Sequence, residues 1–477
     1  MRNILVLLTL LMTGIAAGQE LPDFGSTADM VLSKSRERQI GRSAMLQLRM
    51  AGVMLDDPML TEYVTLLGSK LASQANDGEH RFNFFVVNDD AINAFAMPGG
   101  YIGINSGLIL ASENESELAG VFAHEVSHVT QRHIARSIYD NQRSSIVSLA
   151  TMLAALVLGA ATDGDAAQGV MMAGQAAMAQ RQLNFTRSNE YEADRIGIEV
   201  LAAAGFDPNG MAGFFEKLSR RYGTTGQVVP EYLRSHPIST SRVAEARSRA
   251  RNLPGNPNVD SFAYGLAKAR LRALTPATGE QAMAAFAPRE DSDLPADRYG
   301  RALAMRRVGF DDNAERIFRG LIDEYPGVTA FRIGQAEALF DGGLPEQAMV
   351  VYREALGISP RNVPLTISYA ERLIASGDAA EAHRVLLDLL NNVPPTPAQI
   401  QLIARAANAE GDIANAHHYM SEYYLSIGNL PLALTQLRMA LELPDINGVQ
   451  RSRFRARIEQ IFEFMPEEER RAARGPG

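Results

Sequence analysis

Glycines recur at a fixed interval of 34 residues in the C-terminal half of this chain, at Gly309, Gly343, Gly377 and Gly411. Each is followed five residues later by an alanine, and another alanine precedes it by seven residues. A bulky apolar residue stands nine positions after each glycine, and a proline stands 17 after the first three. Several residue classes in register at one period predict stacked units that bury their apolar faces against one another, not a helical domain with coincidental alanines.

The period resembles the tetratricopeptide repeat, in which two antiparallel helices pack through small residues. The tryptophan usual in that repeat is missing, because the chain contains none. Near the end the phase shifts, since Gly428 and Ala433 repeat the glycine-to-alanine spacing only 17 residues after Gly411. We therefore expect one helix to serve two helix pairs there. Residues 278–283 are a candidate for a degenerate first unit.

The N-terminus has the three parts of a secretory signal peptide. Arg2 supplies the positive charge, residues 4–15 form an apolar core too short for a comfortable membrane span, and residues 16–18 are small. We expect cleavage before Gln19 and localisation in the periplasm of a Gram-negative cell. A retained membrane anchor and secretion from the cell are the weaker alternatives.

Length and composition further restrict the number of domains and the possible functions of the chain. A chain of 477 residues suggests at least two domains, and 46% hydrophobic residues suffice for ordinary cores. The net charge of −9 and the dispersed basic residues argue against a nucleic-acid-binding surface. The absence of cysteine excludes disulfides, a lipoprotein anchor and a thiolate metal site. A linker rich in Asn, Pro and Gly spans 252–258. We therefore divide the chain into a signal peptide (1–18), a first domain (19–255), a repeat domain (256–465) and a charged tail (466–477).

The sequence His124-Glu125-Val126-Ser127-His128 reads H-E-x-x-H within a predicted helix over 116–137. Residues i and i+4 of a helix share a face, so both imidazoles can supply corners of a tetrahedral zinc site. Glu125 then lies beside the metal without binding it, where it can take a proton from water. The motif therefore indicates metal-assisted hydrolysis of an amide bond.

A catalytic zinc needs a third protein ligand. The segment Glu190-Tyr-Glu-Ala-Asp194 lies in a predicted helix over 188–204 and begins 62 residues after His128. We assign Glu190 as the ligand and place Asp194, on the same face, behind one of the two histidines, where it would orient the ring. Glu192 points elsewhere, as expected of a solvated residue.

These motifs, preceded by the segment 93–100 (NAFAMPGG), resemble peptidase family M48. The resemblance implies a zincin-like α+β domain with a small sheet, so that the whole chain is mainly α with an α-helical solenoid at its end. It implies one zinc ion held by His124, His128 and Glu190, with Glu125 as the base. The family's aspartate, matched by Asp194, is commonly written as a proton donor, but an Asp near Zn²⁺ should stay ionised, which favours the orienting role.

His236 precedes Pro237, and Arg242 follows six residues after His236, in a pattern similar to an M48 segment near the active site. Two roles are open. The imidazole or the guanidinium could stabilise the oxyanion of the tetrahedral intermediate. Alternatively, neutral His236 could hold the fourth corner of the zinc and keep the enzyme latent. We read the remaining histidines as ordinary helix or surface residues, namely His80, His133, His383, His417 and His418.

Two further segments have less defined roles. A predicted strand over 82–87 and a turn and strand over 94–110 could form either a platform for an extended substrate or a structural hairpin. The apolar stretch 146–178 is too rich in alanine and glycine for a good membrane span. We expect a helical hairpin there that covers the site or touches a membrane or a partner.

The combination of a signal peptide, this core and C-terminal repeats is similar to periplasmic members of the family that act in outer-membrane protein assembly. The resemblance implies a zinc metalloendopeptidase that degrades misfolded or stalled outer-membrane proteins. The repeats would dock it on such clients or on the barrel assembly machinery, and peripheral membrane contact is possible. The alternative is a chaperone or assembly scaffold whose protease activity is latent.

Overall fold

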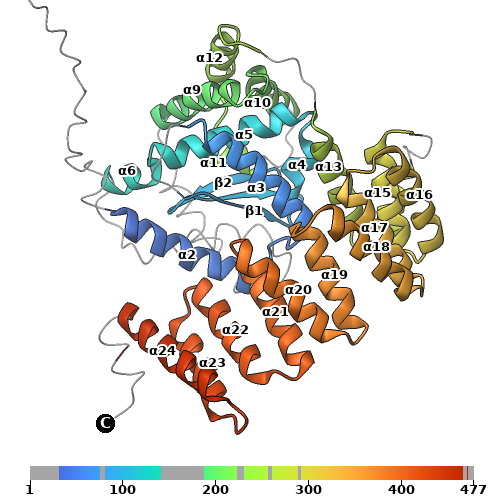
Figure 1. Cartoon of the computed structure of the whole chain (residues 1–477). Coiled ribbons are helices and arrows are strands. Elements are labelled where there is room, and N and C mark those ends of the chain that lie inside the picture. The colour runs from blue at the N-terminus through green and yellow to red at the C-terminus, as the bar shows by residue number, and fades with distance from the viewer. Residues whose placement is uncertain are drawn as a thin grey trace, which may run out of the picture.

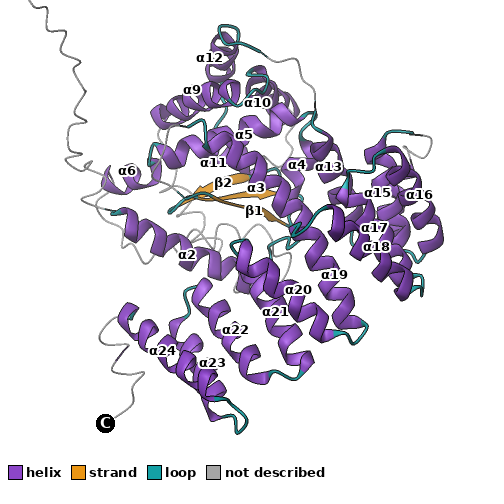
Figure 2. Ribbon diagram, viewed as in Figure 1, coloured by secondary structure: helices purple, strands orange, loops and turns teal. Residues whose placement is uncertain are grey.

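The computed structural model describes residues 32–75, 81–140, 187–222, 230–255, 260–287, 292–465 and 470. The expected signal peptide, the apolar stretch 146–178 and nearly all of the charged tail lie outside these residues. Helices dominate, with one small sheet near the N-terminus, so the expected mainly α fold is confirmed (Figures 1 and 2). Within the described ranges, no helix has the length and apolar composition needed to cross a bilayer.

Three short strands form the sheet, which Figure 2 shows enclosed among helices. They are β1 (Asn83–Val87), β2 (Ala94–Met97) and β3 (Tyr101–Asn105), in the order β1-β3-β2. β1 runs parallel to β3, whereas β2 runs antiparallel to it. Gly99 and Gly100 have φ values of +82° and +85°, which glycine adopts without steric cost, and they make the expected turn between β2 and β3. Strand β2 therefore forms one edge of the sheet within the described residues.

Two helices precede the sheet, α2 (Lys34–Met50) and α3 (Pro58–Ala72). They are separate helices because Asp57 caps α3 by accepting a hydrogen bond from the Leu60 amide, and Pro58 occupies the first turn of α3. Strand β3 continues directly into a short helix, α4 (Ser106–Ala111), where the sequence pattern indicates strand up to residue 110.

Helix α5 (Glu115–Thr130) is the centre of the first domain, and all its residues up to Val129 are buried. It packs against α3 and β2 and against three of the helices that follow, which are α6 (His133–Asp140), α9 (Arg187–Ala203) and α10 (Asn209–Tyr222). Two further helices complete the first domain, α11 (Glu231–Ser235) and α12 (Thr240–Ala250), and α12 packs on α9 and α10. The single helix expected over 116–137 is wrong, since the chain breaks between α5 and α6 at Arg132, whose φ is +52°.

The repeats form a curved solenoid that bends around one side of the first domain (Figure 1). Its helices run in order along the chain: α13 (Phe262–Leu274), α14 (Gly279–Phe286), α15 (Pro295–Arg306), α16 (Asp311–Glu324), α17 (Thr329–Asp341), α18 (Pro345–Ile358), α19 (Val363–Ala375), α20 (Ala379–Asn392), α21 (Pro397–Glu410), α22 (Ile413–Ser426), α23 (Leu430–Glu442) and α24 (Gly448–Phe464). The four periodic glycines all have positive φ, between +79° and +94°, at the turns after α15, α17, α19 and α21. Helix α22 packs on both α21 and α23, as α17 packs on both α16 and α18, so the double use of one helix near the end stays a prediction.

The solenoid packs against the first domain instead of standing free. Helices α13 and α19 both contact α3. At this junction Arg270 of α13 forms a two-pronged ion pair with Asp57, with nitrogen–oxygen distances of 2.7–2.9 Å. Next to the pair lies a cavity of about 1110 Å³, lined by α3 and β1 on one side and by α19 and the segment 393–402 on the other. The groove of the repeats therefore faces the first domain.

Candidate metal centre

The H-E-x-x-H segment lies in the middle of α5, where both histidines and Glu125 are fully buried. Asn114 caps this helix by accepting a hydrogen bond from the Glu117 amide, which fixes its start. Helix α9 approaches closely because Gly197 has no side chain, and a Cβ there would lie 3.2 Å from the Ala123 backbone. The close approach brings the carboxylates of α9 to the histidine face of α5.

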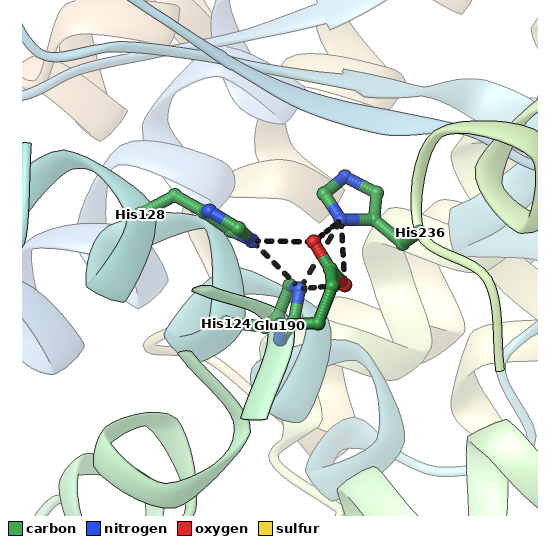
Figure 3. A group of neighbouring side chains, drawn as sticks. All are labelled: His124, His128, Glu190 and His236. Atoms are coloured by element: carbon green, nitrogen blue, oxygen red, sulfur yellow. Dashed lines mark hydrogen bonds and ion pairs between the residues drawn. The ribbon is translucent and has the colours of Figure 1, made fainter. Parts of the chain in front are cut away.

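Four buried side chains converge on one point, His124, His128, Glu190 and His236 (Figure 3). The Nε2 atom of His124 lies 3.0 Å from Nε2 of His128 and 3.3 Å from Nδ1 of His236. The Glu190 carboxylate lies 3.1 Å from His236 Nδ1, 3.5 Å from His128 Nε2 and 3.6 Å from His124 Nε2. Ligands held tetrahedrally at about 2.0–2.1 Å from an ion are separated by about 3.3 Å. The donor set therefore has the chemistry and the size of a tetrahedral metal site.

Asp194 and Arg242 lie directly behind these donors. Nδ1 of His124, the ring nitrogen on the far side from the cluster, lies 3.0 Å from Oδ1 of Asp194. Arg242 donates to both Asp194 oxygens, at 2.7 and 2.8 Å, and to the Pro237 carbonyl at 2.8 Å. Its guanidinium also lies 2.9 Å from Glu190. Arg242 thus ties α12 and the His236 loop to both carboxylates of α9.

The electrostatics of the cluster suit a cation. Burial alone would lower the pKa of His124, but Asp194 and Glu190 outweigh it and raise that pKa to about 9. Burial lowers the pKa of His128 well below its ordinary value, and the neighbouring His124 adds to this shift. Burial opposes ionisation of Glu190, yet His236 and His124 hold its pKa well below the ordinary range. An anionic carboxylate beside a neutral imidazole is what a divalent ion requires of its ligands.

Glu125 occupies the other side of the cluster, next to the sheet. Its Oε1 atom lies 3.5 Å from Nε2 of His236. Burial raises the pKa of Glu125, partly offset by His236, His124 and the backbone of Ala96 in β2. The carboxylate is thus placed between the donor cluster and an edge strand. A general base needs this kind of position beside the reacting groups.

The structure brings together all seven residues that the sequence analysis selected for the site, which are His124, Glu125, His128, Glu190, Asp194, His236 and Arg242. It also adds two that the sequence analysis set aside. His133 is not an ordinary surface residue, because it is fully buried with its Nδ1 atom 2.8 Å from Nδ1 of His128. Glu192 lies 3.1 Å from the other nitrogen of His133. Tyr232 was also missed, and its ring packs 5.0 Å from the His236 ring.

Comparison with known families identifies both halves of the chain. The model of "Peptidase family M48" matches residues 58–250. A "Tetratricopeptide repeat" model matches residues 339–406. The first match contains every residue of the metal centre, and the second lies within the solenoid.

Individual relatives extend the match beyond the first domain. A beta-barrel assembly-enhancing protease of Yersinia pestis is 36% identical over 342 residues, which cover 68% of this chain and 69% of that protein. The protein of that name in Escherichia coli K12 is 39% identical over 313 residues, 64% of this chain and 63% of its own length. The chain thus spans just under two thirds of the latter. The mitochondrial metalloendopeptidase OMA1 of Arabidopsis thaliana is 33% identical over 157 residues, 33% of this chain and 29% of that protein.

Proposed function

The chain belongs to peptidase family M48, and we propose that it is a periplasmic zinc endopeptidase for the quality control and assembly of outer-membrane proteins. The observation that carries the proposal is the buried cluster of four donors, which has the dimensions of a tetrahedral zinc site. We propose the domain limits 19–255 for the peptidase and 256–465 for the repeats, after a signal peptide over 1–18.

In this proposal His124, His128 and Glu190 hold one zinc ion. When bound, the ion would act as a Lewis acid that polarises the scissile carbonyl and makes water a nucleophile at neutral pH. Asp194 orients His124 through the contact with its Nδ1 atom. Arg242 is a positioning residue, because its hydrogen bonds to Asp194 and Pro237 leave it facing the back of the cluster.

Glu125 is the proposed general base. It is a buried carboxylate whose pKa is raised by burial, so it is a better proton acceptor near neutral pH than an exposed glutamate. It takes a proton from the attacking water and returns a proton to the leaving amine. Neither transfer requires a large movement, because the side chain lies between the donor cluster and β2.

Strand β2 is the proposed platform for the substrate. It is an edge strand among the described residues, and its Ala96 lies beside Glu125. An extended peptide can add to such an edge through main-chain hydrogen bonds, which select for unfolded segments more than for particular side chains. Such binding suits misfolded or stalled outer-membrane proteins as clients.

His236 supplies the remaining corner of the tetrahedron. Its Nδ1 atom lies 3.1–3.3 Å from Glu190 and His124, at the distance expected between two ligands of one ion. We therefore favour the latent state, in which His236 holds the position that water must take. His236→Ala should then raise peptidase activity. A fall would instead support an oxyanion role, and no change would exclude both.

The repeats are the proposed docking site for clients or for the barrel assembly machinery, with peripheral membrane contact possible. The relatives are named for beta-barrel assembly, and stacked helical repeats present concave surfaces suited to peptides. A second candidate function, an assembly scaffold with latent protease activity, is favoured by the His236 contact that fills the fourth corner.

The experiment that tests the peptidase is Glu125→Gln, which keeps the shape of the side chain and removes the base. We expect the variant to retain one zinc per chain and to lose cleavage of an unfolded outer-membrane protein by at least about 100-fold. Normal cleavage by this variant would refute the mechanism. Assembly of outer-membrane proteins in cells then separates the two functions, because full rescue by Glu125→Gln would support the scaffold.

A further inference from the structure

A further histidine, His133, lies behind the donor cluster, and the proposed function uses it neither as a zinc ligand nor in catalysis. His133 is fully buried, and its Nδ1 atom lies 2.8 Å from Nδ1 of His128. The opposite nitrogen of the His128 ring, Nε2, faces His124 and Glu190. His133 therefore contacts the His128 ring at the nitrogen that points away from the centre.

A carboxylate continues the chain of contacts. Nε2 of His133 lies 3.1 Å from Oε2 of Glu192, and Arg136 donates to the same oxygen at 2.9 Å. Glu192 stands on α9 between Glu190 and Asp194, so each carboxylate of this segment approaches the centre by a different route. The ion pair with the Arg136 guanidinium keeps the Glu192 carboxylate in its charged form. An ionised carboxylate only accepts, so Nε2 of His133 carries the proton.

The proton positions follow from these distances. Two ring nitrogens 2.8 Å apart share one proton, because two N–H groups or two lone pairs would repel each other. Because Nε2 of His133 donates its proton to Glu192, the Nδ1 atom of the same ring is the acceptor for His128. His128 then donates from Nδ1 and presents the lone pair of Nε2 to the centre, which is the tautomer of a metal ligand.

We propose that His133 and Glu192 are positioning residues that fix the tautomer and orientation of His128, as Asp194 does for His124. This inference rests on the proposed function, in which both histidines hold zinc. The two ligand histidines are positioned differently. The Asp194 carboxylate contacts His124 directly, whereas the Glu192 carboxylate acts on His128 through the imidazole of His133.

The break between α5 and α6 is what makes this contact possible. In a continuous helix, residues five apart point about 140° away from each other, so His133 would face away from His128. Arg132 adopts a φ of +52°, a conformation that costs a non-glycine residue about 1 kcal/mol or more. Its guanidinium donates to the Leu32 carbonyl at 2.7 Å and to Glu37 of α2 at 3.1 Å, which holds the break in place.

The test is the zinc affinity of the full-length protein, measured by competition with a chromophoric chelator. Loss of a residue that orients a metal ligand typically weakens binding tenfold to 100-fold. We expect a loss in this range for His133→Leu and a loss near the lower end for Glu192→Ala. His133→Asn should bind zinc nearly as well as the wild type, because its amide oxygen can accept from His128.

Control variants separate positioning from general destabilisation. His418→Phe removes a half-buried histidine from the solenoid and should leave zinc affinity unchanged. Wild-type affinity in His133→Leu would overturn the inference, as would equal losses in His133→Leu and His133→Asn. If His133→Leu does not fold, the partly exposed Glu192 carries the test, with Glu192→Gln expected to bind more tightly than Glu192→Ala. Zinc binding without peptidase activity in both the wild type and His236→Ala would refute the proposed function and leave this inference intact.

Discussion

The metal centre and the solenoid are both built mainly from helices, yet they depend on opposite kinds of residue. The centre buries charged and polar side chains that come from α5, α9, α12 and the loop after α11. The solenoid buries small apolar residues that recur along the chain, such as Ala302, Ala336 and Ala370, each 0% exposed. Substitutions in the centre should therefore change metal binding more than stability, and substitutions in the solenoid should do the reverse.

The largest effect is expected in the centre, from Glu190→Gln. The amide keeps the size of the side chain but loses the charge that a divalent ion requires, so zinc affinity should fall by on the order of 1,000-fold. The chelator competition assay measures this loss, and urea denaturation should show a smaller change in the stability of the metal-free protein. Glu199→Gln, at an exposed position of the same helix, is the matched control and should bind zinc normally. Unchanged affinity in Glu190→Gln would remove Glu190 from the ligand set.

The sequence predicts these two regions to different extents. The repeats are predictable because each unit contacts its neighbours along the chain. The spacing of residues such as Gly343 and Ala348 is therefore enough to predict the stacked helix pairs. The histidines of the centre are predictable because an i, i+4 pair shares a helix face. In contrast, no local sequence pattern predicts the left-handed conformation of Arg132. The sequence therefore favours a continuous helix, in which His133 would face away from His128.

Contacts between distant segments are the other part that sequence reasoning misses. Asp57 and Arg270 are 213 positions apart, and neither belongs to a motif, yet they join the two domains. Glu192 looks like one more charge on a solvated helix until the position of His133 is known. Arg242 is found by its resemblance to a family segment, but its hydrogen bonds to Asp194 show a positioning role that spacing alone does not reveal.

The next effect is expected in the solenoid, from Phe318→Ala. Phe318 is fully buried, with its ring 6.1 Å from that of Tyr299 and its edge against Gly334. Truncation should cost about 3–5 kcal/mol of unfolding free energy, measured by urea denaturation, while zinc affinity stays at the wild-type value. Phe310→Ala is the matched control, because Phe310 is 55% exposed and should lose less than about 0.5 kcal/mol. A parallel loss of zinc affinity in Phe318→Ala would show that the two regions are not independent.

The smallest effect concerns how the two regions respond to acid. In the solenoid, burial lowers the pKa of His418 to about 4, with Arg453 and Arg457 opposing its protonation and Glu422 favouring it. The unfolded chain, with a pKa near 6.5, takes up this proton first, so the stability contributed by the neutral ring is present above pH 6.5 and is lost as the pH falls toward 4. At pH 5 the loss should be about 1–2 kcal/mol. His418→Phe keeps the stacking on Phe454 and should remove this part of the pH dependence in urea denaturation between pH 7 and 5.

In the centre, by contrast, carboxylates raise the pKa of His124 to about 9, so acid there competes with the metal instead of with folding. The same slope in His418→Phe and in the wild type would show that protonation of His418 does not cause this loss of stability.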